Sequence, residues 1–199
     1  MLTVAFHAVD SCNLQPGQWF AAVGAGGLGQ LAVQYAKAMG FKAMAIDIND
    51  KALEVCKEQG ADLVFNSKTQ SDEYVGKIKK VTGGGAHAAA VFSGAPAAYK
   101  SAPLILRPAG VLMVIGISPA PVEVSTFALA TGAYTVKADS TGTPQRMGKA
   151  VEFTAEHDIT PELDVRSGLE SVNDMISEMK TGQSSRRMAV VFEQDIYRA

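Results

Sequence analysis

Three glycines, Gly24, Gly26 and Gly29, follow a short apolar run and precede a segment of helix-forming residues. In a GxGxxG pattern the first glycine permits a tight turn, the second lets a pyrophosphate approach bare backbone, and the third lets a helix pack closely on a strand. Backbone N–H groups at the start of that helix then face the phosphates, assisted by the helix dipole. The stretch, which also includes Gly27 and Leu28, predicts a dinucleotide site; an ordinary flexible turn is the alternative.

A dinucleotide site of this kind also needs a carboxylate at the end of the following strand. Asp47 ends the next apolar run, 18 residues after Gly29. At that place it can accept hydrogen bonds from both hydroxyls of an adenosine ribose, and it would repel the 2′-phosphate of NADP. We therefore expect the cofactor to be NAD(H). The alternative for Asp47 is a helix N-cap or a solvated strand end.

Other catalytic patterns are missing from the sequence. His7, His87 and His157 stand singly, without an HxxxH or HExxH pattern, and Cys12 and Cys56 belong to no CxxC pattern. A zinc site needs at least three protein ligands, so we expect no zinc, and we expect two buried cysteines in a reduced compartment. No GxSxG nucleophile motif occurs either.

Composition limits the partners. The 199 residues carry a net charge of −2, and 47% of them are hydrophobic. Lysine and arginine are scattered rather than gathered in a stripe, which argues against nucleic acid. No apolar run approaches the roughly 20 residues that cross a bilayer, and no signal peptide is recognisable. We expect a cytoplasmic protein without a membrane partner.

Apolar runs alternate with amphipathic segments, which is typical of a parallel sheet covered by helices. The α/β fold that we predict is a Rossmann doubly wound, six-stranded parallel sheet with a short C-terminal strand-helix-strand appendage. Its strands are expected at 19–23, 42–47, 62–65, 86–94, 110–117 and 134–139, and its helices at 28–39, 50–59, 71–81, 97–106 (kinked at Pro103) and 143–157, with a short helix before the sixth strand.

We expect two parts in the chain. Residues 1–159, with a leading helix in 1–14, form the dinucleotide-binding domain, and residues 160–199 form the appendage, with strands at 160–166 and 187–193 around a helix. Forty residues are too few to hold a core. The appendage must therefore pack on another surface, and we expect a homo-oligomer formed through it.

Ligands of such sheets bind beyond the carboxyl ends of the strands. The segments expected there are 24–29, 93–95, 115–117 and 139–143, which include Ser93 and Thr141. Most of their residues are small or polar, which leaves room for a flat ring.

The stretches "LQPGQWFAAVGAGGLGQLAVQYAKAMG", "AIDIND", "RPAGVLMVIGI", "STGTPQ" and "MKTGQSSRRMAVVFE" resemble the cofactor domain of the zinc-dependent alcohol dehydrogenases of the medium-chain dehydrogenase/reductase superfamily. The resemblance implies that residues 24–29 hold the pyrophosphate and that Asp47 holds the ribose. It places further residues around the cofactor: Lys51 beside the ribose, Ile115, Ile117 and Thr3 at the nicotinamide, and Arg187, with Arg186 as the alternative, at the pyrophosphate.

The resemblance also implies what the sequence lacks. Family members carry two catalytic zinc ligands, the proton relay and a structural zinc lobe in an N-terminal domain, on which the appendage packs, and Met1 begins just after the remaining zinc-ligating cysteine. We therefore expect a truncated form without the zinc site, with very weak or no alcohol dehydrogenase turnover. Asp139 is a weak candidate for an acid or base in a metal-free reaction, and His7 is a more remote one.

Three functions follow. The first is the NAD(H)-binding domain of an alcohol dehydrogenase-like oxidoreductase, whose substrate would be a small alcohol or carbonyl compound. The second is a metal-free reductase or isomerase on the same scaffold. The third is a cofactor-binding pseudoenzyme or assembly module.

Overall fold

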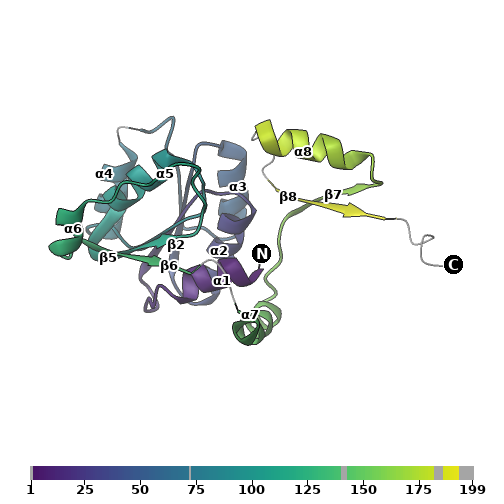
Figure 1. The fold of residues 1–199 in the computed structure, drawn as a ribbon. Coiled ribbons are helices and arrows are strands. Elements are labelled where there is room, and N and C mark those ends of the chain that lie inside the picture. Colours follow the sequence, from purple (N-terminus) through teal and green to yellow (C-terminus); the bar gives the residue numbers. More distant parts are fainter. Residues whose placement is uncertain (1, 72, 140–142, 182–185, 193–199) are drawn as a thin grey trace.

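The structure is a computed structural model that describes residues 2–71, 73–139, 143–181 and 186–192. Six strands form one parallel sheet in the order β3-β2-β1-β4-β5-β6. Its strands are β1 (Trp19–Val23), β2 (Lys42–Asp47), β3 (Leu63–Asn66), β4 (Ala86–Val91), β5 (Leu106–Val114) and β6 (Tyr134–Ala138). The winding reverses between β1 and β4, so the predicted doubly wound fold is confirmed (Figure 1).

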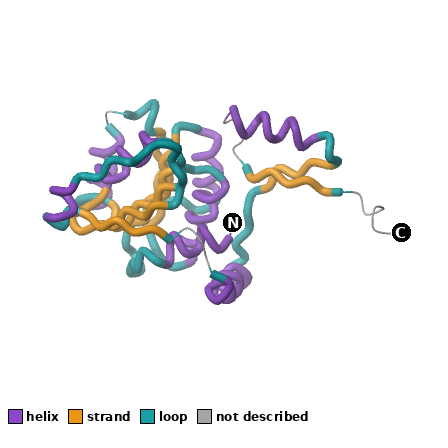
Figure 2. The backbone as a smooth tube through the Cα atoms, in the orientation of Figure 1, coloured by secondary structure: helices purple, strands orange, loops and turns teal. Residues whose placement is uncertain are grey.

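Helices cover both faces of this sheet (Figure 2). One face packs on α1 (Leu2–Asp10), α2 (Gly27–Ala38), α3 (Asp50–Glu58) and α7 (Pro144–Glu156). The other packs on α4 (Tyr74–Thr82), α5 (Pro96–Ser101) and the 3-10 helix η1 (Ala102–Ile105), with α6 (Thr126–Ala130) at its edge. All five residues of β1 are buried, as expected for a central parallel strand between two helical layers.

Alternate residues of β1 belong to the two cores. Phe20 and Ala22 join the cluster under α1 and α2, whereas Trp19, Ala21 and Val23 join the cluster under α4 and α5. This alternation is the period of a strand. Cys12 and Cys56 are buried free thiols, as predicted, and burial raises the pKa of each thiol to about 12.

The fifth strand begins earlier than the sequence predicts. The expected start was residue 110, but β5 already pairs with β4 through Leu106, opposite Ala86, and its register shifts before Val111 pairs with Ala88. Ala109 has a φ of 60° in this irregular stretch. The "RPAG" sequence therefore forms a bulge within the strand rather than a turn before it. The strand ends at Val114, so Ile115 and Ile117 lie beyond it.

The last described segment forms a separate unit, which we call the β7–α8–β8 unit. Strands β7 (Leu163–Ser167) and β8 (Arg187–Val191) pair in parallel, and α8 (Ser171–Thr181) connects them. Figure 1 shows the unit beside the main sheet, joined to it through α7. This agrees with the strand-helix-strand pattern predicted for the C-terminal residues. None of the described helices is long and apolar enough to span a membrane.

Candidate functional site

Gly24 directly follows the first strand in a backbone conformation that favours glycine. Its φ is +104°, and a Cβ built there would lie 2.9 Å from the backbone nitrogen of Ser93. Its own N–H donates to the carbonyl of Ile46 at 2.8 Å. A side chain at this position would be strained and crowded, so the turn between β1 and α2 depends on glycine.

Gly26 has the opposite surroundings. It is the N-cap of α2, and a Cβ built on it meets nothing within 4 Å. No side chain caps the helix at Gly26, although the first N–H groups of a helix lack partners within the helix. Backbone without a side chain therefore faces open space at the positive end of the helix dipole, which suits a phosphate.

Gly29 allows the helix to touch the strand. A Cβ built on Gly29 would stand 1.9 Å from the carbonyl oxygen of Gly24, a distance that real side chains do not reach. Close packing of α2 on the end of β1 therefore requires this glycine, which is the role that the sequence pattern assigned to it.

A cavity of about 540 Å³ opens beside this loop, and we call it the glycine-loop cavity. It is bounded by the loop, by the ends of β2 and β4, and by the β7–α8–β8 unit. Its lining residues are Gly24, Gly26, Gly27, Leu28, Gly29, Asp47, Phe92, Ser93, Met179, Arg186, Arg187 and Met188. The structure thus gathers five parts of the chain that are distant in sequence around one space.

Asp47 is held in place by backbone groups. Its Oδ2 accepts a hydrogen bond from the N–H of Ala25 at 2.6 Å. Its Oδ1 accepts from Ile48 at 2.7 Å and from Asn49 at 3.0 Å. The carboxylate therefore ties the glycine loop to the end of β2. Oδ2 retains one further acceptor site, whereas Oδ1 already accepts two hydrogen bonds. The N-cap of α3 is Asn49, whose side chain accepts from Lys51 and Ala52, so the alternative reading of Asp47 as that cap is wrong.

A second cavity, of about 920 Å³, adjoins the first and shares Gly24, Asp47 and Ser93 with it. Its walls include Ile46, Ile48, Tyr74 and Val75. Ile48 is 66% exposed, which is unusual for an isoleucine and leaves an apolar surface directly after Asp47.

The remaining predicted residues are spread around these cavities. Ser93 lines both, and its hydroxyl accepts from the N–H of Ala95 at 3.1 Å. Lys51 lines a neighbouring cavity between α3 and the β7–α8–β8 unit. Ile117 is 92% exposed, whereas Ile115 is buried in the core. Thr3 lies on α1 and is half-buried. Thr141 lies outside the described residues.

The two adjacent arginines differ in their partners. Both line the glycine-loop cavity, and Arg186 Nε lies 3.9 Å from a carboxylate oxygen of Glu162. No carboxylate among the described residues lies within ion-pair distance of Arg187. The sequence did not single out Phe92, Met179 or Met188 as lining residues. The position of Phe92, directly before Ser93 at a strand end, was the available signal.

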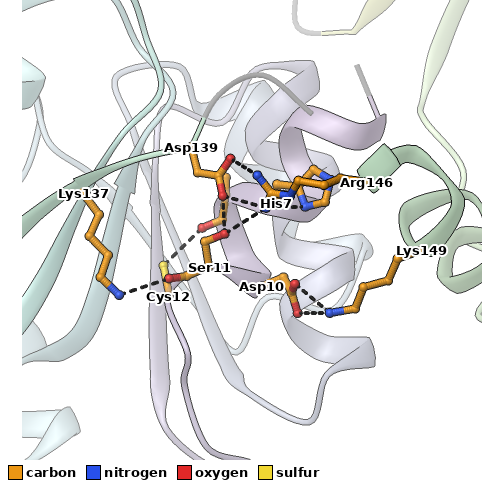
Figure 3. A network of polar contacts seen from close by, with 9 residues as sticks. His7, Asp10, Ser11, Cys12, Lys137, Asp139, Arg146 and Lys149 are labelled. Carbon is orange, nitrogen blue, oxygen red and sulfur yellow. Dashed lines mark hydrogen bonds and ion pairs between the residues drawn. The ribbon is translucent and has the colours of Figure 1, made fainter. Parts of the chain in front are cut away.

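Asp139 belongs to a polar network that joins α1, β6 and α7 (Figure 3). The Nη1 and Nη2 of Arg146 donate to its two carboxylate oxygens, each at 2.8 Å, and the Ser11 hydroxyl donates to the same carboxylate. The hydrogen bond from Arg146 holds the pKa of Asp139 below its usual range. A carboxylate that stays ionised in such contacts acts as a structural anchor and is poorly suited to accept a proton at neutral pH.

His7 lies in the same network. Arg146 Nη2 is 3.0 Å from His7 Nδ1, and burial, followed by the charge of Arg146, lowers the pKa of His7. The Nε2 atom is buried and has no hydrogen-bond partner among the described residues. The imidazole is therefore neutral at pH 7, with the Arg146 guanidinium as a donor to Nδ1.

A metal site does not fit the described residues. Within the ranges that the structure describes, no group of three or more His, Cys, Asp or Glu side chains could hold a metal ion.

The chain is similar to a family of known proteins. Residues 27–156 match the family model described as zinc-binding dehydrogenase. The chain is 35% identical over 185 residues to an alcohol dehydrogenase of Geobacillus stearothermophilus, covering 93% of this chain and 54% of that protein. The chain thus spans about half the length of the curated relatives it matches.

Solved structures agree in fold. The alcohol dehydrogenase of Aeropyrum pernix superposes with a TM-score of 0.85 at 25% identity, covering 95% of this chain and 55% of that one. The acetophenone reductase of Geotrichum candidum, solved in complex with NAD, superposes with a TM-score of 0.81 at 19% identity, covering 95% of this chain and 52% of that one.

Proposed function

Because this chain belongs to the zinc-binding dehydrogenase family, as the cofactor-binding domain of an alcohol dehydrogenase-like oxidoreductase, we propose that it binds NAD(H) at the glycine-loop cavity. The observation that carries the proposal is the contrast between Gly26 and Gly29. Gly26 leaves its backbone uncovered beside open space, and Gly29 allows α2 to pack closely on the end of β1. Together they present the start of α2 to a diphosphate.

In this proposal each residue around the loop has one task. The diphosphate lies on the N–H groups of residues 26–29, and Arg187, whose charge no described carboxylate offsets, faces it from the β7–α8–β8 unit. Asp47 accepts hydrogen bonds from the adenosine ribose. Ile48 and the second cavity receive the adenine ring, because they offer an apolar wall beside Asp47.

The nicotinamide half of the cofactor is proposed to lie beyond the ends of β4, β5 and β6. Thr3, Ile115 and Ile117 are assigned to it by resemblance, and Thr141 belongs to a segment expected at the carboxyl ends of the strands. Ile117 is almost fully exposed and can contact a ring directly; Ile115 can contribute its backbone. When bound, the cofactor supplies hydride-transfer chemistry for a small alcohol or carbonyl substrate, and this chain's residues bind and orient it. The described residues do not form a site for zinc.

Lys51 is proposed as a secondary contact. It lies in the first turn of α3, on the cavity next to the glycine-loop cavity, and shares Arg186 and Met188 as neighbours in the lining. From there its charge would approach the ribose rather than the diphosphate.

Self-association through the β7–α8–β8 unit stays a proposal as well. Val165, Met179 and Val191 are exposed there by 55% or more, and such apolar surface favours a partner. Sedimentation equilibrium would show a dimer or larger species; a strict monomer would contradict it.

Parallel fluorescence titrations with NADH and NADPH test the cofactor proposal. We expect saturable binding of NADH and at least about tenfold weaker binding of NADPH, since the Asp47 carboxylate would face the added phosphate. Preference for NADPH would overturn the role of Asp47, and failure to bind either would overturn the function.

A further inference from the structure

Gln30 is a polar side chain buried at the start of α2. It is 1% exposed, and its Nε2 donates a hydrogen bond to the carbonyl oxygen of Ala25 at 2.8 Å. Ala25 lies between Gly24 and Gly26 and is itself fully buried. The contact therefore joins α2 to the residue that separates the first two glycines of the loop.

The Ala25 carbonyl has no donor in the main chain. No backbone N–H of the described residues donates to it, and the first main-chain hydrogen bond of α2 runs from the N–H of Gln30 to the carbonyl of Gly26, at 2.9 Å. A buried carbonyl without a donor raises the free energy of the folded state. The Gln30 side chain supplies that donor, because Ala25 lies one residue outside the helical ladder.

The other side of Ala25 is held by Asp47, whose Oδ2 accepts a hydrogen bond from the Ala25 N–H at 2.6 Å. Ala25 is thus fixed between the end of β2 and the start of α2. The peptide unit that follows it is trans, and in a trans unit the C=O and the N–H point in opposite directions. Because the Ala25 carbonyl points at the buried Gln30 amide, the Gly26 N–H points away from it.

The Gly26 N–H is left for a ligand. Gly26 lines the glycine-loop cavity, and no described residue accepts a hydrogen bond from its N–H. The space where a side chain would stand is open as well. An anionic ligand in the cavity therefore has this N–H to bind as long as the peptide unit between Ala25 and Gly26 keeps its orientation.

Gly26 does not fix that orientation by itself. Its φ is −70° and its ψ is −175°, but glycine populates positive φ about as readily. Rotation of the peptide unit between Ala25 and Gly26 would turn the carbonyl oxygen toward the cavity in place of the N–H. A carbonyl oxygen there would repel a phosphate, which the N–H attracts. The hydrogen bond from Gln30 opposes this rotation, because the rotation would break it.

We propose that Gln30 is a positioning residue for the diphosphate, an inference that rests on the NAD(H) function proposed above. Gln30 holds the Ala25 carbonyl in the interior and thereby keeps the Gly26 N–H directed at the ligand. Asp47 holds the same loop, but it is also assigned to the ribose, so its loss has two effects. Loss of the Gln30 amide acts on the diphosphate alone, and ligands without a diphosphate should not depend on it.

Gln30→Met tests this role, since methionine has a similar length but cannot donate a hydrogen bond. Calorimetric titration of the 199-residue variant should show NADH and ADP-ribose binding weakened about tenfold. Adenosine, which has no diphosphate, should bind within about twofold of its affinity for the unchanged chain, as measured by NMR titration. Gln34→Met is the matched control. Gln34 Nε2 donates to the carbonyl of Thr160 at 2.9 Å from the same helix, so its loss should leave NADH binding unchanged.

The possible results separate this role from the NADH site itself. NADH binding by Gln30→Met equal to that of the unchanged chain would overturn the role of Gln30 and leave the NADH site standing. Equal weakening of NADH and adenosine would mean a general effect on the fold, and it would overturn the positioning role. No NADH binding by the unchanged chain would overturn the proposed function.

The unchanged chain offers a second measurement if Gln30→Met does not fold. Amide NMR should show a side-chain NH₂ proton of Gln30 that exchanges with solvent at least about tenfold more slowly than those of Gln34, whose contact with Thr160 is exposed. The Gly26 amide resonance should shift when ADP-ribose binds. Equal exchange of the two glutamine side chains would contradict a persistent contact with Ala25 and overturn the proposal.

Discussion

The carbonyl oxygen of Gly24 occupies the space that a side chain on Gly29 would need. A Cβ built on Gly29 would stand 1.9 Å from that oxygen. Gly26, three residues earlier, has open space at the same position. Substitution of the two glycines should therefore have different effects, on folding stability at Gly29 and on NADH affinity at Gly26. Gly29→Ala should destabilise the fold by about 2 to 3 kcal/mol through overpacking, as measured by urea denaturation.

Gly26→Ala should fold normally and lose NADH affinity by about tenfold or more, because the methyl group would occupy the approach to the start of α2. Titration with NADH measures this. Gly148→Ala is the control, since Gly148 lies in α7 with nothing within 4 Å of its Cβ position; it should bind NADH normally. Normal binding by the Gly26 variant would contradict the account of the loop.

Asp47→Asn should weaken NADH binding about tenfold and narrow the discrimination against NADPH. The amide keeps one acceptor oxygen but places an NH₂ group where a carboxylate oxygen now accepts from Ala25 or from Ile48 and Asn49. Calorimetry with both cofactors measures the change. Glu152→Gln, which removes a charge on exposed α7, is the control. An unchanged NADH/NADPH ratio would argue against Asp47 at the ribose.

Arg187→Gln should reduce NADH affinity by about tenfold to a hundredfold, because a charge-assisted hydrogen bond to phosphate would be lost. Arg186→Gln should reduce it less, since Arg186 lies near Glu162. The salt dependence of binding should also fall in the Arg187 variant. A larger effect of Arg186→Gln would reassign the phosphate contact to that residue.

Asp139→Asn should destabilise the protein by about 1 to 2 kcal/mol at pH 7, and the half-exposed Arg146 keeps the effect modest. The folded-state pKa of Asp139 is lowered, so this stabilisation is present above the unfolded pKa of about 3.9 and is lost as the pH falls through the folded value. Urea denaturation should show a smaller difference in the free energy of unfolding between wild type and Asp139→Asn at pH 3 than at pH 7.

The control for Asp139 is Asp10→Asn, which breaks an ion pair to a Lys149 that is 64% exposed; its effect should stay within about 0.5 kcal/mol. A stability of the Asp139 variant equal to wild type at pH 7 would contradict the anchoring role.

The order of helices and strands could be predicted from the sequence because each helix and each strand is encoded by a local pattern of residues. The five buried residues of β1, the glycine turn and the amphipathic α2 are neighbours in the chain. The start of β5 could not be predicted, since "RPAG" has the composition of a turn and forms a bulge only because β4 pairs with Leu106.

Contacts between distant residues escaped prediction for a similar reason. Arg146 joins His7, 139 positions earlier, and nothing in the sequence near either residue indicates that contact. From the sequence Asp139 was a weak acid or base candidate, and only the fold shows that Arg146 and Ser11 bind its carboxylate. The glycine-loop residues were predictable because their chemistry is backbone chemistry, which a short motif encodes.

The central claim is that the backbone amides at the start of α2 hold a diphosphate, and amide NMR of a ¹⁵N-labelled chain titrated with NADH tests it directly. We predict saturable chemical-shift changes for Gly26, Gly27, Leu28 and Gly29 that ADP-ribose reproduces and adenosine does not. Saturable NADH binding that leaves these four amides unmoved would contradict the claim.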